Sequence, residues 1–244
     1  KAADVVTEID IQAQEIILEK LQPTIRRYDL GVLGEEGKQD DSRLEKSCFW
    51  TIDPLDGTQY FIEGESGYAT SIALVSQSGV PILGVVYDPV HDQLYESVIG
   101  CGVTLNGVAL EKSVPPMKGE MATTLFADRS LRNYPQFPVY QEHFSVRYIG
   151  GAVINALQLL NEPSSVYLKP TKKPLGGCAI WDLAAVSLMV AECAGSVCTY
   201  GGETLPLNRQ SSIFFNDIGF VFASADVELD SLLAWLHKMA PAGR

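Results

Sequence analysis

The sequence predicts a layered α+β sandwich, in which a mostly antiparallel first sheet is followed by a second, mixed α/β lobe. Three observations lead to this fold class. An amphipathic helical repeat opens the chain, a block of β-rich runs separated by turn signals follows, and strands then alternate with helices. With 244 residues, of which 46% are hydrophobic, the chain is long enough to bury a sizeable core.

The first half of the chain is predicted to contain one helix and then strands. Thr7 and Asp10 match a capping box, so a helix of about four turns should begin there and end at Pro23. The polar residues 34–46 are expected to form a loop, and the Asn-Gly pair at 106–107 marks a tight hairpin turn. The predicted strands are residues 48–53, 68–75, 82–88 and 93–98.

The second half is predicted to alternate strands with helices. Two prolines and a glycine in residues 112–120 interrupt the pattern, and we place there the boundary between an N-terminal lobe, 1–112, and a C-terminal lobe, 113–244. A helix over residues 181–194 should stop at Gly195. The other predicted elements are strands at 123–127, 166–168, 196–199 and 219–223 and helices at 152–160 and 227–239.

Composition and charge narrow the classes of function. The formal charge of −12 argues against binding to a nucleic-acid polymer or an anionic membrane, since both need a basic face. The sequence has no long apolar run and no signal-peptide pattern, so we expect a cytoplasmic protein. Five cysteines without CxxC pairs are expected to be buried thiols. Because the first residue is Lys1 rather than methionine, we expect a further N-terminal segment.

The most informative stretch is DPLDGT at residues 53–58, which ends a predicted apolar strand. Pro54 keeps Asp53 extended, and Gly57 permits a sharp turn. Asp53 and Asp56 would repel each other where the strand stops unless a hard cation lay between them, and oxygen ligands suit Mg²⁺ better than Zn²⁺. An aspartate-rich turn is the alternative, but the apolar strand before it favours a metal site.

Gly57 and Thr58 are expected to face the substrate, because backbone N–H groups in a tight turn or at a helix start can cradle a phosphate. The Thr58 hydroxyl is then in place to orient a water. In contrast, His91, His143 and His237 stand far apart in the sequence, so a histidine nucleophile or a zinc site has little support.

Residues 53–58 resemble the signature of the inositol monophosphatase superfamily, which also contains the 3'(2'),5'-bisphosphate nucleotidases. The resemblance covers nearly the entire chain and lacks only the family's first helix. The other similar stretches are VTEID at 6–10, GEE at 34–36, GGA at 150–152 and WDLAA at 181–185. The resemblance implies an αβαβα arrangement of layers and a Mg²⁺-dependent phosphatase of small phosphate monoesters such as inositol monophosphate.

By resemblance, two Mg²⁺ ions share the site, and a weaker third ion lies beside Glu35. The ligands implied are Glu35, Asp53 and the Leu55 carbonyl for the first ion and Asp53, Asp56 and Asp182 for the second. Asp53 is expected to bridge the ions, because it lies at the strand end between the other ligands. Two adjacent cations can polarise the phosphoryl oxygens, activate water and stabilise the leaving alkoxide. The substrate contacts implied are Asp56, Gly57, Thr58, Gly151, Ala152 and Asp182.

Asp10 has two interpretations of equal weight. As the partner of Thr7 it would stabilise the start of the first helix without touching the site. By resemblance it would instead accept a hydrogen bond from Thr58, aligning that hydroxyl on the attacking water while Glu35 takes the proton. Both roles can coexist only if the helix begins beside the metal ions.

Asp182 also suits the N-cap of the helix that follows it. Trp181 and the small residues after Asp182 would let that helix approach the first lobe closely, which favours a metal ligand. Glu36 is expected to support a ligand or to face solvent, since adjacent side chains seldom reach the same ion.

The substrate is less well defined by the sequence. Inositol monophosphatases carry an acidic residue a few positions before the WD signature, and residues 169–178 contain none. Lys169, Lys172 and Lys173 either meet a second phosphate, as in a bisphosphate nucleotidase, or form a solvated basic loop, which is the commoner case. Ile154 stands where bacterial nucleotidases usually place a lysine, and this opposes the nucleotidase alternative.

Three further expectations complete the hypothesis. The resemblance implies a homodimer, and the magnesium site suggests inhibition by lithium. A non-catalytic, metal-binding or regulatory relative is the alternative from another class. It is disfavoured because a protein without the reaction has no physical reason to hold so many carboxylates together.

Overall fold

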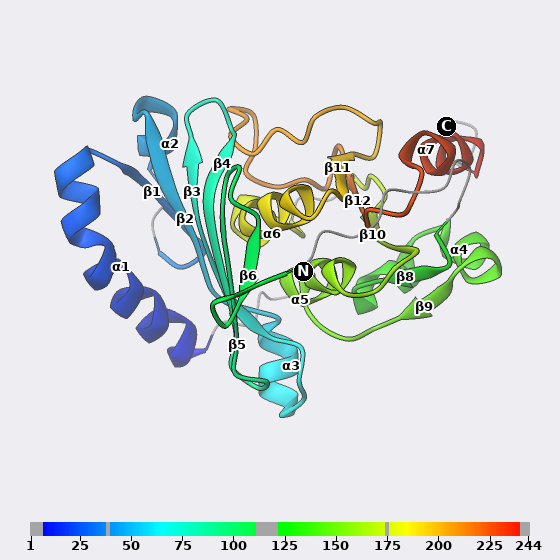
Figure 1. The fold of residues 1–244 in the computed structure, drawn as a ribbon, viewed down its shortest axis with the longest axis horizontal. Helices are drawn as coiled ribbons and strands as arrows, with labels where there is room; N and C mark the ends of the chain where they lie inside the picture. Colours follow the sequence, from blue (N-terminus) through cyan, green and yellow to red (C-terminus); the bar gives the residue numbers. More distant parts are fainter. Residues whose placement is uncertain (1–6, 38–39, 111–121, 174–175, 240–244) are drawn as a thin grey trace.

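The structure is a computed structural model that describes residues 7–37, 40–110, 122–173 and 176–239. Five layers follow one another in it (Figure 1). Helix α1 (Glu8–Tyr28) lies outside the first sheet, α5 (Ala152–Leu157) and α6 (Ile180–Glu192) lie between the two sheets, and α4 (Phe137–His143) and α7 (Leu229–Met239) lie outside the second. This alternation of three helical layers and two sheets confirms the predicted αβαβα sandwich.

The first sheet contains seven strands in sequence order and is antiparallel except at one edge, where β1 runs parallel to β2. It confirms the expected first sheet and adds β1, β6 and β7, each of which is too short for its residue pattern to reveal. The turn at 106–107 is also confirmed, since Asn106 and Gly107 have φ values of 50° and 77°. The strands are β1 (Gly31–Gly34), β2 (Cys48–Asp56), β3 (Ala69–Ser76), β4 (Pro81–Asp88), β5 (Gln93–Val98), β6 (Val103–Leu105) and β7 (Val108–Ala109).

The second sheet is mixed, as predicted. Its order is β11-β12-β10-β8-β9, with β10 parallel to β8 and antiparallel to β12. The residues that separate β7 from β8 include 111–121, so the predicted lobe boundary lies outside the described residues and stays a prediction. The strands are β8 (Thr124–Phe126), β9 (Ser145–Arg147), β10 (Ser165–Lys169), β11 (Ser196–Thr199) and β12 (Phe220–Ala223).

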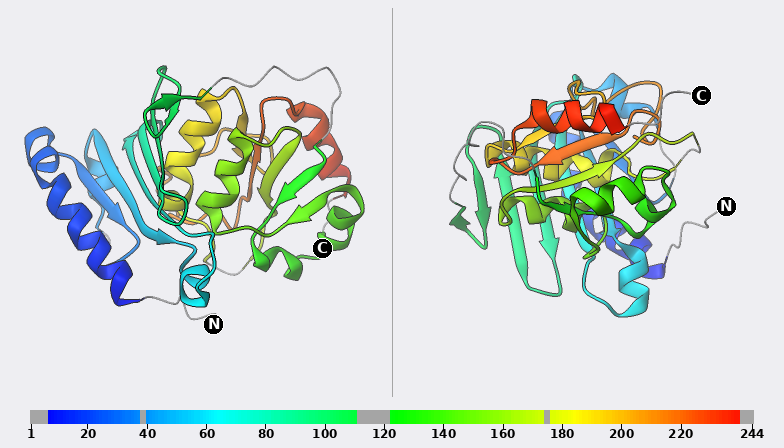
Figure 2. Two further views of the ribbon diagram at one scale, coloured as in Figure 1. Left: turned by 60° about the horizontal axis from the view of Figure 1, so that its bottom comes forward. Right: turned by 90° about the vertical axis from the view of Figure 1, so that its right-hand side faces the viewer.

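Helix α6 lies between the sheets, beside α5 (Figure 2). Its residues from Ile180 to Val190 are all buried, which explains why it is apolar all round. A Cβ atom on Gly84 of β4 would lie 3.0 Å from the Cα of Ala185, so small residues at both positions let the helix approach the sheet. This contact brings the start of α6 to the end of β2, and it is the close approach that the sequence predicted.

The prediction that Pro23 ends the first helix is wrong, because α1 continues to Tyr28. A proline removes one N–H donor, here the one that would bond the Glu19 carbonyl, and both residues are exposed, so water can satisfy that carbonyl. The last turn of the helix, beyond Pro23, is tied to the sheet, where the indole N–H of Trp50 donates to the Thr24 hydroxyl at 3.3 Å. Tertiary contact thus outweighs the local effect of the proline.

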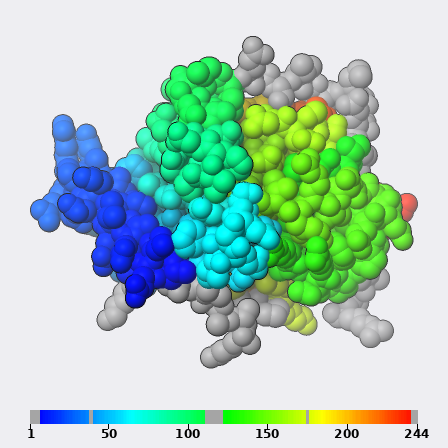
Figure 3. All heavy atoms as spheres, turned by 90° about the horizontal axis from the view of Figure 1, so that it is seen from below, coloured from blue at the N-terminus to red at the C-terminus, as the bar shows by residue number. Residues whose placement is uncertain are grey.

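Several short elements escaped prediction. Helix α2 (Ser42–Glu45) lies in the stretch expected to be a loop, and α3 (Thr58–Glu63), α4, β9 and the 3₁₀ turn η1 (Arg129–Asn133) were not predicted. The helix predicted over 152–160 is α5 continued by a second 3₁₀ turn, η2 (Gln158–Leu160). Each has only one or two turns or three strand residues, too few for a periodic pattern to emerge. Figure 3 shows α3, in cyan, on one face of the molecule, between α1 in blue and the segments coloured green.

The end of α6 differs from prediction in its mechanism. Ala194, and not Gly195, takes the left-handed conformation, with φ of 66°. Gly195 is needed for packing instead, because a Cβ atom there would lie 2.6 Å from Cγ1 of Val190.

Among the cysteines, all of them free thiols, Cys101 is exposed, so the expectation of buried thiols fails there. None of the described helices combines the length and the low polarity needed to cross a membrane.

Candidate metal centre

A β-bulge brings Asp53 and Asp56 to the same face at the end of β2. In a regular strand, side chains three residues apart point to opposite faces of the sheet. Here Asp53 pairs with Ser71 and Asp56 pairs with Ala69, so three steps along β2 match two steps along β3. Pro54 lies in this irregularity, where a residue without an N–H is tolerated. The extra residue turns Asp56 back toward Asp53.

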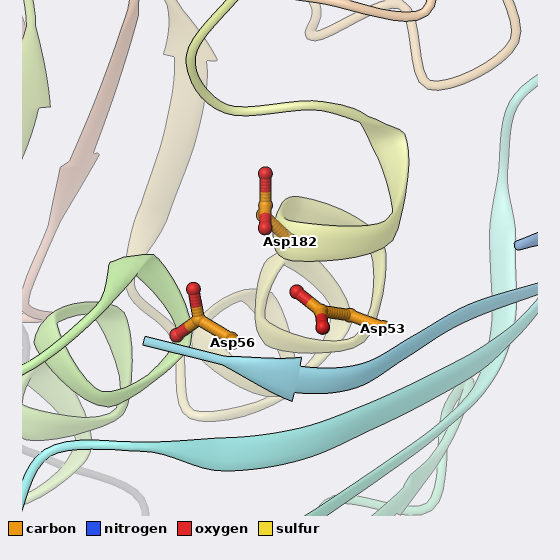
Figure 4. A group of neighbouring side chains, drawn as sticks. All are labelled: Asp53, Asp56 and Asp182. Carbon is orange, nitrogen blue, oxygen red and sulfur yellow. The ribbon is translucent and has the colours of Figure 1, made fainter. Parts of the chain in front are cut away.

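Asp182 joins them from the first turn of α6. It is the third residue of that helix rather than its N-cap, and its carboxylate accepts the backbone N–H of Ala179 at 2.6 Å. One carboxylate oxygen from each of Asp53, Asp56 and Asp182 lies within 4.8 Å of the other two. Figure 4 shows the three side chains directed into a common space. Asp182 therefore supports the helix start and belongs to the acidic cluster at once.

The hydrogen bonds of the cluster leave one oxygen without a partner. Asp53 Oδ1 accepts the N–H of Leu55 at 2.9 Å, but Asp53 Oδ2 is buried and has no hydrogen-bond partner among the described residues. The two oxygens of Asp56 accept the N–H groups of Ala152 and Val153 at 3.1 and 2.8 Å. A buried carboxylate oxygen without a donor is unfavourable, and a bound cation would satisfy it.

Glu35 extends the cluster. Its backbone N–H donates to the carbonyl of Ile52 at 3.0 Å, which continues the pairing of β1 with β2 by one residue. Its carboxyl group lies close enough to Asp53 for the two groups to affect each other's ionisation. Burial, followed by the charge of Asp182, raises the pKa of Glu35 to about 8.

The aspartates of the cluster are also poor acids. Burial raises the pKa values of Asp53, Asp56 and Asp182 above their ordinary range. The charge of Asp182 raises the pKa values of Asp53 and Asp56 further. Four acidic groups that resist ionisation because they are buried together form a site whose charge a divalent cation would balance.

Thr58 and Asp10 meet beside this cluster. The Thr58 hydroxyl lies 3.2 Å from Asp10 Oδ1 and 3.1 Å from the Leu55 carbonyl oxygen, and its one proton can serve either acceptor. The other oxygen of Asp10 accepts the Thr7 backbone N–H at 2.9 Å and the Thr7 hydroxyl. The helix cap and the contact with Thr58 therefore coexist, since α1 begins beside the acidic cluster.

The glycines of the site permit close approaches. Gly57 has φ of 84°, and a Cβ atom there would lie 2.6 Å from the Gly67 carbonyl oxygen. A Cβ atom on Gly151 would lie 2.4 Å from Asp56 Oδ2. The N–H groups of Gly151 and Ala152 donate to Gly67 and Asp56, so this turn holds a cluster carboxylate. Contact of Gly57, Gly151 and Ala152 with a substrate stays a prediction.

A mostly buried ion pair between Lys169 and Asp128, called the wall below, lies near the cluster. The sequence analysis did not predict it. The expectation that Lys169 is solvated is wrong, because Lys169 is mostly buried, pairs with Asp128 and donates to Cys178 Sγ at 2.9 Å. Asp128 also accepts from Asn155 Nδ2 at 3.2 Å and from the Tyr167 hydroxyl at 3.3 Å. The sequence could have revealed this pair, because Lys169 ends the apolar strand β10 and a buried charge needs a partner.

The other two lysines differ from Lys169. Lys172 is half-buried and Lys173 is exposed, so the expectation of a solvated loop fits Lys173. Lys169 and Lys172 both line a small cavity of about 10 Å³, together with Cys178 and Asn216. That volume is enough for about one water molecule.

Comparisons with known proteins agree with the geometry. A model described as "Inositol monophosphatase family" matches residues 1–239. The chain is 31% identical to an inositol-1-monophosphatase of Synechocystis over 99% of its own length and 82% of the relative's. It is 32% identical to a protein of Xylella fastidiosa named Nus factor SuhB, over 83% of this chain and 72% of that one.

The fold also has solved counterparts. One is a crystal structure described as an IMPase/NADP phosphatase complexed with Mg²⁺ and phosphate. It aligns with a TM-score of 0.73 at 20% identity and covers 98% of this chain and 83% of that one. At this level of identity, the comparison supports the layered fold described above.

Proposed function

The chain belongs to the inositol monophosphatase family, and from that premise we propose that this metal-dependent phosphatase hydrolyses a small phosphate monoester such as inositol monophosphate. The observation that carries the proposal is the meeting of Asp53, Asp56 and Asp182 at the end of β2. Glu35 at the edge of this cluster and the hydrogen bond between Thr58 and Asp10 supply groups for moving a proton.

The residues fit Mg²⁺, because every side-chain donor is a carboxylate and Asp53 Oδ2 is buried without a partner among the described residues. We assign Glu35, Asp53 and the Leu55 carbonyl to one ion and Asp53, Asp56 and Asp182 to a second, with a third near Glu35. When bound, these ions supply the positive charge that polarises the phosphoryl group and activates water.

The protein's own groups orient and deprotonate that water. Asp10 Oδ1 accepts the Thr58 proton, which leaves the lone pairs of the Thr58 oxygen to accept a hydrogen bond from a water. The Glu35 carboxylate, at the edge of the aspartate cluster, is the proposed acceptor of the water proton. The backbone N–H groups that start α3 at Gly57 and Thr58 have no intrahelical partner and are the proposed contacts for the phosphate. Gly151 and Ala152, which lie against Asp56, are also proposed to contact the substrate.

A second candidate substrate is a nucleotide with an extra phosphate, such as a 3'(2'),5'-bisphosphate. The observation that suggests it is the presence of two lysines, Lys169 and Lys172, at one small cavity, although that cavity is too small for a phosphate group. It is opposed by the pairing of Lys169 with Asp128, which already balances one of these charges. We therefore rank it below inositol monophosphate.

The test is release of phosphate from inositol 1-phosphate and from adenosine 3',5'-bisphosphate, with and without Mg²⁺. Wild type, Asp53→Asn and the control Asp29→Asn, which changes an exposed aspartate that pairs with Lys46, are compared. We expect turnover that needs Mg²⁺, is lost in Asp53→Asn and is kept in Asp29→Asn. Turnover without Mg²⁺, or equal turnover in Asp53→Asn, would contradict the proposal. Intact Mg²⁺ binding without turnover of any phosphate ester would favour the non-catalytic alternative.

We also propose that the protein is a cytoplasmic homodimer and that lithium inhibits it at the magnesium site. Sedimentation of the full chain measures the oligomeric state, and a monomer would end that part of the proposal. Activity that is unchanged at millimolar Li⁺ would remove the lithium hypothesis and leave the phosphatase intact.

A further inference from the structure

The buried residues of α1 are polar. Only two residues of this helix are buried, Asp10 and Gln14, and they lie one turn apart on the same face. A helix that packs for stability alone would bury apolar residues on that face. The burial of Asp10 is explained by its hydrogen bond with Thr58 beside the cluster. The burial of Gln14 needs a contact that explains it in the same way.

The Gln14 side chain holds the backbone of Glu36 by two hydrogen bonds. Its Oε1 accepts the Glu36 N–H at 3.0 Å, and its Nε2 donates to the Glu36 carbonyl oxygen. Satisfying both groups of one residue, as a neighbouring strand would, fixes the position and the direction of the chain there. On the other side, the preceding residue is held by β2, since Glu35 donates to the Ile52 carbonyl. The segment that carries Glu35 is therefore held between α1 and β2.

The absence of a side chain at Gly34 leaves room for the Gln14 amide. A Cβ atom at position 34 would lie 2.4 Å from Gln14 Oε1 and 2.8 Å from its Cδ. Any side chain at Gly34 would thus displace the Gln14 amide from its two partners. The two positions depend on each other, although 20 residues of sequence separate them.

We propose that Gln14 is a positioning residue that fixes the Glu35 segment so that the Glu35 carboxylate reaches the metal ions beside Asp53. The proposal rests on the proposed function, because it assigns Glu35 to those ions. Gln14 itself touches neither the aspartate cluster nor Thr58 by any hydrogen bond among the described residues, so it acts through the backbone.

The first experiment measures Mg²⁺ binding to the full chain by titration calorimetry, without any substrate. Gln14→Leu removes both hydrogen bonds at similar volume, and Gln12→Leu makes the same change at an exposed position of the same helix. We expect Gln14→Leu to weaken Mg²⁺ binding about 10-fold, the lower end for groups that support metal ligands. Gln12→Leu should bind as wild type does. Unchanged Mg²⁺ affinity in folded Gln14→Leu would overturn the proposal.

The second experiment follows backbone hydrogen exchange and uses Gly34→Ala. We expect faster exchange of the Glu36 N–H in both Gln14→Leu and Gly34→Ala, since each releases it from the same acceptor. The double variant should bind Mg²⁺ no more weakly than either single variant, because both changes break one contact. If the two losses multiply, Gln14 and Gly34 act separately and the proposal fails. Should Gln14→Leu not fold, Gly34→Ala alone decides the outcome by its Mg²⁺ affinity.

These readouts separate the proposal from the proposed function. Wild type that binds Mg²⁺ but releases phosphate from no ester would refute the phosphatase activity, and the Gln14 comparison would still be decided by binding. Wild type that binds no Mg²⁺ would refute both.

Discussion

Two neighbouring regions of this molecule bury charged side chains, and they treat the charge in opposite ways. The cluster of Asp53, Asp56 and Asp182 gathers like charges and leaves Asp53 Oδ2 without a donor among the described residues. The wall nearby pairs Lys169 with Asp128, whose carboxylate also accepts from two further side chains. In the wall, the negative charge of Asp128 is balanced by the positive charge of Lys169. In the cluster, the carboxylate charges are balanced only when a cation binds.

This difference predicts opposite effects of removing one charge. In the cluster, a neutral side chain relieves repulsion in the metal-free protein and removes a ligand from the metal-bound protein. In the wall, a neutral side chain leaves its partner buried and unpaired. Removing single charges from each region therefore tests this contrast.

The largest effect is expected for Asp53→Asn. Mg²⁺-dependent turnover should fall by more than about 100-fold, beyond the effect of groups that only support ligands. In the presence of EDTA, the free energy of unfolding should rise, because a carboxyl group that is costly to ionise in the buried cluster is replaced by a neutral amide. Phosphate assays and urea denaturation measure the two quantities. Lower stability of the metal-free variant would contradict the proposed cost of burying the Asp53 carboxyl group in the cluster.

Lys169→Met is expected to destabilise the protein by about 3–5 kcal/mol, with or without Mg²⁺, since Asp128 then stays buried without its cation. Adding Asp128→Leu to it should restore much of the loss, because no buried charge remains. Urea denaturation of the wild type, both single variants and the double variant measures the coupling. If Lys169→Met and the double variant lose the same free energy of unfolding, the unpaired charge of Asp128 is not the cause of the destabilisation.

The pH dependence of metal-free stability should differ from that of most proteins. Burial and Asp182 raise the Glu35 pKa from 4.5 to about 8 in the folded state, so the folded protein binds more protons than the unfolded chain between these values. Stability should therefore fall as pH rises from about 4.5 to about 8 in EDTA. Mg²⁺ should remove most of this slope, because it stabilises the ionised carboxylates. Denaturation curves across that pH range, with and without Mg²⁺, provide the measurement, and a slope of the opposite sign would be inconsistent with the buried cluster.

The smallest effect concerns the substrate. If Lys172 meets a second phosphate, Lys172→Met should raise KM for adenosine 3',5'-bisphosphate about 10-fold or more, since a hydrogen bond to a charged group contributes about 1.5–3 kcal/mol. KM for inositol 1-phosphate should stay unchanged, and Lys173→Met, at an exposed position, is the matched control. Equal KM values in both variants for both substrates would exclude Lys172 from substrate binding.

The sequence alone predicts much of the candidate site. The motif at 53–58 names two of the cluster's aspartates, and the order of the main helices and strands follows from their residue patterns. The cap of α1 is local, since Thr7 and Asp10 lie in one helical turn, and it was therefore readable. These features depend on neighbours within a few residues.

Other features depend on residues far apart in the chain, and only the tertiary structure decides them. The bulge that aligns Asp53 with Asp56 exists through pairing with β3, and Asp182 reaches them because Ala185 packs on Gly84. Lys169 is buried because Asp128, 41 residues earlier, can pair with it. Residue patterns encode conformation over one or two turns, whereas burial and charge pairing are set when distant segments pack together. For that reason the sequence named the acidic residues, and the packing of α6 against the first sheet made them a site.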